Sequence, residues 1–205
     1  DRRDGKVRVS YALPDHRRLF VTTDRLSAFD RIIAGVPYKG QVLNQLSWWW
    51  FEHSRDLVAN HALSTPDPNV LIAREATPLS VEVIVRGYIT GVTDTALWTR
   101  YAAGERLIYG HAFPDGLKKK TPLPAPIITP TTKGAAGAHD EPLSSTEVVE
   151  QGFVEAGRWA AVEVAALAMF ERGAQRGLEA GLILADTKFE FGVTAEGELL
   201  LIDEV

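Results

Sequence analysis

Apolar and polar residues alternate in short runs along the first part of the chain, which is the pattern of β-strands with one buried face. Such runs lie at residues 6–9 and 19–22, with the turn signal Pro-Asp between them. Two similar runs, at 70–73 and 81–85, are separated by the sequence Ala-Thr-Pro. The pattern therefore predicts strands at these four places.

Three segments carry the spacing of amphipathic helices. Apolar residues recur every three or four positions from 41 to about 59, and a short helix is expected at 94–101. A longer helical pattern runs from 148 to 178, with Gly152 and Gly157 as candidate break points. A capping box at 144–147 precedes it, and Gly181 is its expected C-cap. Three consecutive tryptophans in the first helix are expected in a core or an interface, because successive helical residues point about 100° apart and cannot all face one ligand.

The rest of the chain completes the predicted fold. Residues 113–142 are rich in Pro, Gly, Thr and Lys and lack periodicity, so an extended loop is expected there. Two strands, 187–193 and 198–204, follow the long helix and are joined by a turn at Glu196 and Gly197. Strands in runs, with helices grouped between them, predict an α+β fold.

Composition excludes several classes of function. The 205 residues include 22 Lys and Arg against 27 Asp and Glu, a net charge of −5, which argues against general nucleic-acid binding. The absence of cysteine excludes disulfides, thiolate nucleophiles and Cys-ligated zinc, and it fits a reducing compartment. No apolar run is long enough to span a membrane, and no signal peptide is recognisable. The first residue is not Met and the apolar run at 199–205 stops abruptly, so we expect a piece of a longer protein.

A predicted strand near the end of the chain carries the most informative chemistry. Side chains alternate across a strand, so Asp186, Lys188 and Glu190 share one face. The opposite face is aromatic and belongs in a core. The face made of acid, base and acid is expected to be hydrated or to hold a ligand.

The predicted turn brings a further carboxylate to this face. A two-residue loop at Glu196 and Gly197 would place Glu190 directly opposite Asp203. Like charges at opposed positions destabilise a sheet, whereas a divalent cation between them would make the pair favourable. Two interpretations are open: a Mg²⁺ site with nucleotide phosphates, or an exposed edge whose acids point into water.

Several cations and loop residues are weaker candidates. Lys6 and Arg8 would share a strand face after a glycine, which suits a polyphosphate but also suits an exposed basic strand. Lys133, among small residues in the long loop, is a candidate anion-binding group, and Arg86 at a strand end is a candidate fork for a phosphate or carboxylate. The alternative for Lys133 is a disordered loop, and the alternative for Arg86 is that it precedes ordinary turn residues.

Two pairs of polar residues in predicted loops, each with one aspartate, complete the candidates. Ser27 and Asp30 lie in the loop after the second strand, where they are also ordinary turn formers. His139 and Asp140 are adjacent and suit acid–base chemistry. A transition-metal site is disfavoured because no second histidine lies at ligand spacing.

Seven segments, in this order, resemble the SAICAR synthetase family (phosphoribosylaminoimidazole-succinocarboxamide synthase). They are GKVR at 5–8, SAFD at 27–30, KGQVLNQLS at 39–47, VEVIVRGYITG at 81–91, PLPAPIITPTTK at 122–133, HDEPLS at 139–144 and LADTKFEFG at 184–192. The resemblance implies an ATP-dependent ligase of purine biosynthesis. It joins the amine of L-aspartate to the carboxylate of CAIR, a phosphoribosyl aminoimidazole, and yields SAICAR, ADP and phosphate through an acyl phosphate.

The resemblance also implies roles for individual residues. The implied ATP contacts are Lys6, Arg8, Glu75, Leu79, Lys133 and Lys188. The implied catalytic residues are Lys133, Lys188 and Asp186, and the implied Mg²⁺ ligands are Glu190 and Asp203. The implied substrate contacts are Ser27, Asp30, Arg86, Thr93, His139 and Asp140. Val92 stands where the family usually has a serine that meets the CAIR phosphate, which Thr93 would have to replace.

The implied architecture has two lobes, an antiparallel one over 1–79 and an α/β one over 80–205, with ATP in the cleft between them. By analogy it resembles kinase and ATP-grasp folds. The family continues beyond the last strand of this chain, so the second lobe is expected to be truncated. We expect small-molecule substrates, a cytoplasmic protein, no membrane or nucleic-acid partner, and a possible homo-oligomer. Two rival hypotheses are another ATP-dependent phosphotransferase on this scaffold, acting on a different acid, and a nucleotide-binding or structural remnant without enzymatic activity.

Overall fold

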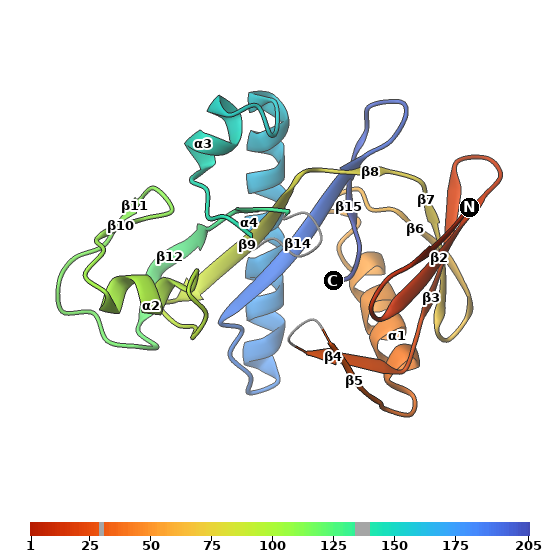
Figure 1. Ribbon diagram of the computed structural model, residues 1–205, viewed down its shortest axis with the longest axis horizontal. Helices are drawn as coiled ribbons and strands as arrows, with labels where there is room; N and C mark the ends of the chain where they lie inside the picture. The colour runs from red at the N-terminus through yellow and green to blue at the C-terminus, as the bar shows by residue number, and fades with distance from the viewer. Residues whose placement is uncertain (29–30, 134–139) are drawn as a thin grey trace. The chain divides into compact units, whose positions relative to one another are not determined.

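The structure is a computed structural model that describes residues 1–28, 31–133 and 140–205. Its strands and helices confirm the predicted α+β class (Figure 1). The chain divides into two compact units, one formed by Asp1–Pro78 with Phe191–Val205 and the other by Leu79–Glu190. This division differs from the predicted one at Leu79 and in the last fifteen residues. The last fifteen residues group with the first unit because backbone hydrogen bonds join Leu201 to Ala59 and His61.

The first unit contains a five-stranded antiparallel sheet in the order β1-β2-β3-β7-β6. Its strands are β1 (Arg2–Asp4), β2 (Arg8–Leu13), β3 (Arg17–Thr22), β6 (Ala62–Asp67) and β7 (Val70–Arg74). Two shorter strands, β4 (Arg25–Ala28) and β5 (Arg31–Gly35), form a separate hairpin where a loop was expected. That expectation was wrong, and a register shift within this hairpin interrupts its alternation.

Helix α1 (Lys39–Glu52) packs on this sheet through a face that the apolar pattern did not predict. Its buried residues are Gly40, Asn44, Ser47 and Phe51. A Cβ atom at Gly40 would lie 2.4 Å from the carbonyl oxygen of Thr22, so the glycine is what allows this close approach.

The apolar stripe that predicted helix α1 lies on its exposed side. Val42 is 60% exposed and Leu46 is 50% exposed. Trp49 is also exposed and stacks on His53, with 4.0 Å between the ring centroids. The expectation of core packing is therefore wrong for Trp49, whereas its two tryptophan neighbours are half-buried. The helix also ends at Glu52, seven residues before the predicted end.

The hairpin between β14 (Asp186–Val193) and β15 (Leu199–Ile202) turns through a three-residue loop. The N–H of Thr194 donates to the carbonyl of Glu198, and the N–H of Gly197 donates to the carbonyl of Thr194. Gly197 has a φ of +90°, which this loop requires and glycine adopts without strain. The predicted two-residue loop is wrong, and with it the register that placed Glu190 opposite Asp203. Short strand β8 (Thr77–Pro78) pairs with β14 through Gly192 and Val193.

His61 is a buried titratable group in the core of the first unit. It is 3% exposed, and its ring lies 5.2 Å from the ring of Phe51 and 5.8 Å from that of Phe20. Its Nε2 atom has no hydrogen-bond partner within the described part of the chain. Burial, together with the nearby charge of Arg8, lowers the pKa of His61 to about 3. The ring is therefore neutral in the folded protein at neutral pH.

This histidine predicts an acid-sensitive stability. The unfolded chain binds a proton at His61 near pH 6.5, whereas the folded protein resists it down to about pH 3. Between these values the free energy of unfolding falls as the pH falls, by about 1.4 kcal/mol per unit. At pH 5 the loss is about 2 kcal/mol relative to pH 7.5. Urea unfolding of wild type and of His61→Leu at pH 5 and pH 7.5 measures this loss of stability. An equal loss in the two proteins would contradict the assignment of the loss to His61.

The second unit is built around β9 (Val81–Tyr88). On one side β9 pairs antiparallel with β12 (Pro122–Ile128) and β13 (Thr131–Thr132), and on the other with the first half of β14. Helix α4 (Ala156–Glu179) packs on β9 and β12 (Figure 1). The long loop expected over 113–142 thus contains two strands, which corrects that prediction.

Two helices lie in the predicted helical pattern, which is interrupted at Gly152, one of its two candidate break points. Ser144 caps α3 (Ser145–Glu150) with the predicted capping box, since the backbone N–H of Glu147 donates to its hydroxyl and the Glu147 carboxylate accepts from its N–H. The chain then turns at Gly152, which has a φ of +75°, and α4 begins. Gly181, at a φ of +74°, follows the end of α4 as predicted.

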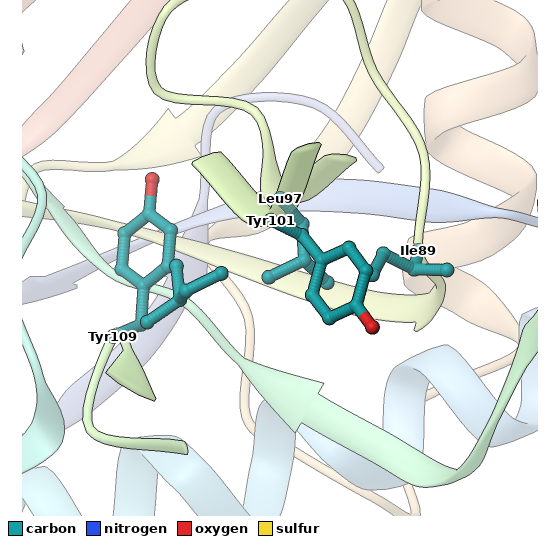
Figure 2. Packing of buried hydrophobic residues seen from close by; sticks show 5 residues of the cluster. Ile89, Leu97, Tyr101 and Tyr109 are labelled. Atoms are coloured by element: carbon teal, nitrogen blue, oxygen red, sulfur yellow. The ribbon is translucent and has the colours of Figure 1, made fainter. Parts of the chain in front are cut away.

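A second apolar cluster lies in the second unit, beyond the end of β9. It contains Ile89, Leu97, Tyr101, Ile108 and Tyr109, four of which are labelled in Figure 2. Ile89 directly follows β9, and the others come from α2 (Leu97–Ala102) and from the hairpin of β10 (Leu107–Ile108) and β11 (His111–Ala112). The predicted short helix begins at 94, whereas α2 begins three residues later at Leu97. No described helix of either unit is long and apolar enough to cross a membrane.

Candidate functional site

The sheet of the second unit has one apolar and one charged face. Val81, Val83 and Val85 of β9 and Phe189 of β14 are buried, which confirms the predicted core face of β14. Asp186 pairs with Arg86, and Lys188 pairs with Ile84. Directly paired residues point to the same side of a sheet, so the alternate residues of both strands make up the charged face.

Four side chains on this face form a chain of alternating charge, here called the Glu82–Lys133 row. The Nζ atom of Lys188 lies 3.0 Å from Oε1 of Glu82 and 2.7 Å from Oε1 of Glu190. The Nζ atom of Lys133 lies 2.6 Å from Oε2 of the same Glu190. The row therefore runs Glu82, Lys188, Glu190, Lys133. It joins β9, β14 and the residue that follows β13.

The side chains of the row are sufficiently buried for these ion pairs to shift the pKa values of their members. The side chain of Glu190 is 17% exposed, and that of Lys133 is 25% exposed. Burial alone would raise the pKa of Glu190, but hydrogen bonds from Lys133 and Lys188 hold that pKa below its usual value. Burial alone would lower the pKa of Lys188, but Glu190 and Glu82 raise it above its usual value. Both groups are therefore charged at neutral pH.

A second charged pair lies beside the row. Arg86 donates from Nη1 to Oδ2 of Asp186 at 3.0 Å and from Nε to the hydroxyl of Thr129 at 2.9 Å. The guanidinium is fixed in orientation by these two contacts, and the Arg86 side chain is 12% exposed. Three cations and three carboxylates thus share one face. Such a face can bind a phosphorylated anion only by exchanging internal ion pairs for contacts with the ligand.

Glu82 and Thr129 also belong to this face, although neither is among the candidate residues predicted from the sequence. The signal for Glu82 was present, because Glu82, Ile84 and Arg86 alternate with three valines. The pairing of β9 with β14 was not visible in the sequence. Thr129 lay inside the segment expected to be a loop.

The amino-terminal cations are arranged differently from the prediction. Residues 5–8 form the turn between β1 and β2, in which the N–H of Gly5 donates to the carbonyl of Arg8. Lys6 therefore lies in a turn and does not share a strand face with Arg8. The Arg8 side chain forms ion pairs with Asp203 and Glu204 and lies 5.7 Å from the centre of the Phe20 ring.

Glu75 is engaged in a structural ion pair. Both its oxygens accept hydrogen bonds from Arg18, whose Nη1 also donates to Ser10. The Arg18 side chain is 9% exposed. Leu79, another of the predicted ATP contacts, is half-buried at the start of the second unit.

Among the remaining predicted substrate residues, the described ones (Ser27, Thr93 and Asp140) are not members of the Glu82–Lys133 row. Ser27 lies in β4 opposite Ile32. Thr93 is exposed, and its carbonyl accepts from the N–H of Ala96, while Val92 is 81% exposed. Asp140 is exposed. Asp30 and His139 lie outside the described residues.

The described residues contain no group of three or more His, Cys, Asp or Glu side chains placed to hold a metal ion. Mg²⁺ bound with a nucleotide needs only one or two carboxylates, because phosphate oxygens and water complete its shell. An ionised glutamate such as Glu190 has the donor chemistry for that ion. Its two oxygens contact lysines here.

The SAICAR synthetase family model matches residues 1–205. A putative phosphoribosylaminoimidazole-succinocarboxamide synthase 2 of Mesorhizobium japonicum is 50% identical over 201 residues, which is 98% of this chain and 64% of the relative. A phosphoribosylaminoimidazole-succinocarboxamide synthase of Legionella pneumophila strain Lens has the same identity and coverage. The chain thus spans 64% of the length of these curated relatives.

Solved structures agree with the sequence relatives. The SAICAR synthase of Saccharomyces cerevisiae, solved in complex with SAICAR, has a TM-score of 0.82 and 33% identity over 99% of this chain and 72% of its own. A type-2 SAICAR synthetase in complex with ADP has the same TM-score at 23% identity, over 100% of this chain and 80% of its own, and shows the shared fold. From its sequence and its fold, the chain belongs to the SAICAR synthetase family.

Proposed function

We propose that this chain carries the ATP-dependent chemistry of a ligase that joins L-aspartate to CAIR and yields SAICAR, ADP and phosphate. The observation that carries the proposal is the Glu82–Lys133 row, in which two lysines share one ionised glutamate on a partly buried sheet face. Family membership supports it, as do relatives named for this activity. The yeast relative was solved with SAICAR, the product.

The reaction has two balanced steps. A carboxylate oxygen of CAIR attacks the γ-phosphorus of ATP, the bond from phosphorus to the ADP oxygen breaks, and an acyl phosphate forms. The aspartate amine then attacks the acyl carbon, the bond from carbon to the phosphate oxygen breaks, and the amine loses a proton. Neither step needs a protein nucleophile. Both need cations placed around the phosphates.

The row supplies such cations from a rigid sheet. We assign Lys133 and Lys188 to the phosphates, with Asp186 beside them holding Arg86 toward the substrate. Glu190 is the proposed Mg²⁺ ligand, and the metal would offset phosphate charge. Asp203 as a second ligand rests on the sequence resemblance alone. The other proposed ATP contacts are Lys6, Arg8, Glu75 and Leu79, and the other proposed substrate contacts are Ser27, Asp30, Thr93, His139 and Asp140.

Two structural facts refine these proposals. Arg8 must exchange its ion pairs with Asp203 and Glu204 for phosphate contacts. The Glu75 carboxylate is held by Arg18, so we propose that the backbone rather than this side chain recognises adenine near Glu75. Cytoplasmic location and a homo-oligomeric state stay predictions.

Substrate omission tests the proposed function. We expect the intact protein to release ADP only when ATP, Mg²⁺, CAIR and L-aspartate are all present, because the acyl phosphate is turned over by the amine. A coupled assay for ADP, with each component omitted in turn, measures this dependence. ADP release that needs CAIR but not aspartate points to a phosphotransferase instead. No release with all components present contradicts the proposal.

A further inference from the structure

Glu82, on strand β9, forms an ion pair with Lys188 on the neighbouring strand β14. It lies on β9 directly opposite Thr131 of β13, and its side chain is 21% exposed. Its carboxylate lies 3.0 Å from the ammonium of Lys188 on the neighbouring strand β14. The contact spans two strands of a packed sheet, so its geometry is fixed by the fold rather than by a flexible loop.

The two lysines of the row therefore differ in how they are held. Lys188 contacts two carboxylates, Glu82 and Glu190. For Lys133 the structure gives one carboxylate among the described residues, which is Glu190. If Glu190 turns away, Lys188 keeps its ion pair with Glu82. Lys133 then loses the one carboxylate that it contacts among the described residues.

We propose that Glu82 is a positioning residue that keeps Lys188 in place when Glu190 turns to a metal–nucleotide ligand. Lys188 is then the fixed cation of the site, and Lys133 is the cation released to follow the phosphate. The inference rests on the proposed function for the identity of the ligand. Glu82 itself contacts neither nucleotide nor substrate and acts only through Lys188.

The direct test is a double-mutant cycle on nucleotide binding, with ADP as the probe. We expect Glu82→Gln to weaken ADP binding about tenfold in the presence of Mg²⁺, and by less without Mg²⁺, where Glu190 still holds Lys188. In a Lys188→Met background, Glu82→Gln is expected to have no further effect, because the residue it positions is absent. Isothermal titration calorimetry of the four proteins, with and without Mg²⁺, measures the coupling.

Glu179→Gln is the matched control, because Glu179 pairs with Arg176 at the exposed end of α4, away from the charged face. It should bind ADP as wild type does. An equal effect of Glu82→Gln in the wild-type and Lys188→Met backgrounds overturns the inference, as does an effect no larger than that of the control. If Glu82→Gln does not fold, Glu82→Asp, which keeps the charge on a shorter arm, takes its place in the cycle.

Turnover gives a second readout that separates this inference from the proposed function. We expect Glu82→Gln to lower kcat for ADP release by about tenfold and Glu82→Asp to restore part of it, with KM for aspartate unchanged. A changed KM for aspartate together with an unchanged kcat contradicts a role through Lys188. If the wild-type protein binds ADP with the expected coupling but makes no SAICAR, the proposed function fails and the positioning role stands.

Discussion

Replacing Glu190 by Gln is expected to reduce the release of ADP that depends on CAIR and L-aspartate by about a thousandfold. Glutamine keeps the shape of the side chain but removes the charge that holds Lys133 and Lys188 together and that would bind Mg²⁺. Lys188→Ala should have a comparable effect by removing a cation from the phosphates. The coupled ADP assay with saturating substrates measures both variants.

The loss must come from chemistry rather than from unfolding. Glu190 lies on the charged side of β14 while Phe189 and Phe191 fill the core, so Glu190→Gln should keep a melting temperature within a few degrees of wild type. Glu179→Gln serves again as the control with unchanged activity. Turnover near the wild-type rate in either site variant would refute the assignment of this face as the active site.

Glu75→Gln is expected to lower the free energy of unfolding by about 3 kcal/mol. The Arg18 guanidinium is almost fully buried, and Glu75 supplies its charged partner through both oxygens. Removal of that charge leaves a buried cation whose remaining partners among the described residues are Ser10 and a neutral amide. Urea unfolding at neutral pH, followed by tryptophan fluorescence, measures the change.

A surface pair in the same unit provides the comparison. Glu52 pairs with Arg55 at 2.6 Å, but both side chains are substantially exposed. Glu52→Gln should therefore change the free energy of unfolding by about 1 kcal/mol or less. Equal effects of the two substitutions would show that the Arg18–Glu75 pair is not a structural anchor of the first unit.

The parts of the fold that were predicted well are set by local pattern. The alternation of β14 follows from a period of two residues and placed Asp186, Lys188 and Glu190 correctly on one face. The capping box at Ser144 needs only two side chains three residues apart. Neither feature depends on what the segment packs against.

The parts that were missed depend on partners elsewhere in the chain. Strand β12 contains three prolines, which cannot donate to a ladder, and its pairing with β9 shifts register between Pro122 and Ile127. Helix α1 buries small polar residues because Gly40 lets it approach Thr22 closely, so its apolar stripe did not mark the buried face. The hairpin loop after Thr194 fits two or three residues equally well by composition, and only the backbone hydrogen bonds decide.

The candidate site shows the same division. The resemblance and the alternation of β14 identified Lys133, Lys188 and Glu190, and the structure brings these three together. Glu82 escaped notice because its importance comes from the pairing of β9 beside β14, a contact between residues 106 positions apart. Long-range strand pairing of this kind is not encoded in any short motif.

Transfer of an isotopic label tests the central claim most directly. CAIR labelled with ¹⁸O in both carboxylate oxygens is incubated with the intact protein, ATP, Mg²⁺ and L-aspartate, and the phosphate released is analysed by mass spectrometry. If the carboxylate is activated as an acyl phosphate, each phosphate released carries one ¹⁸O atom, because the acyl carbon–oxygen bond breaks in the second step. Unlabelled phosphate, formed at the same rate as SAICAR, would contradict the account.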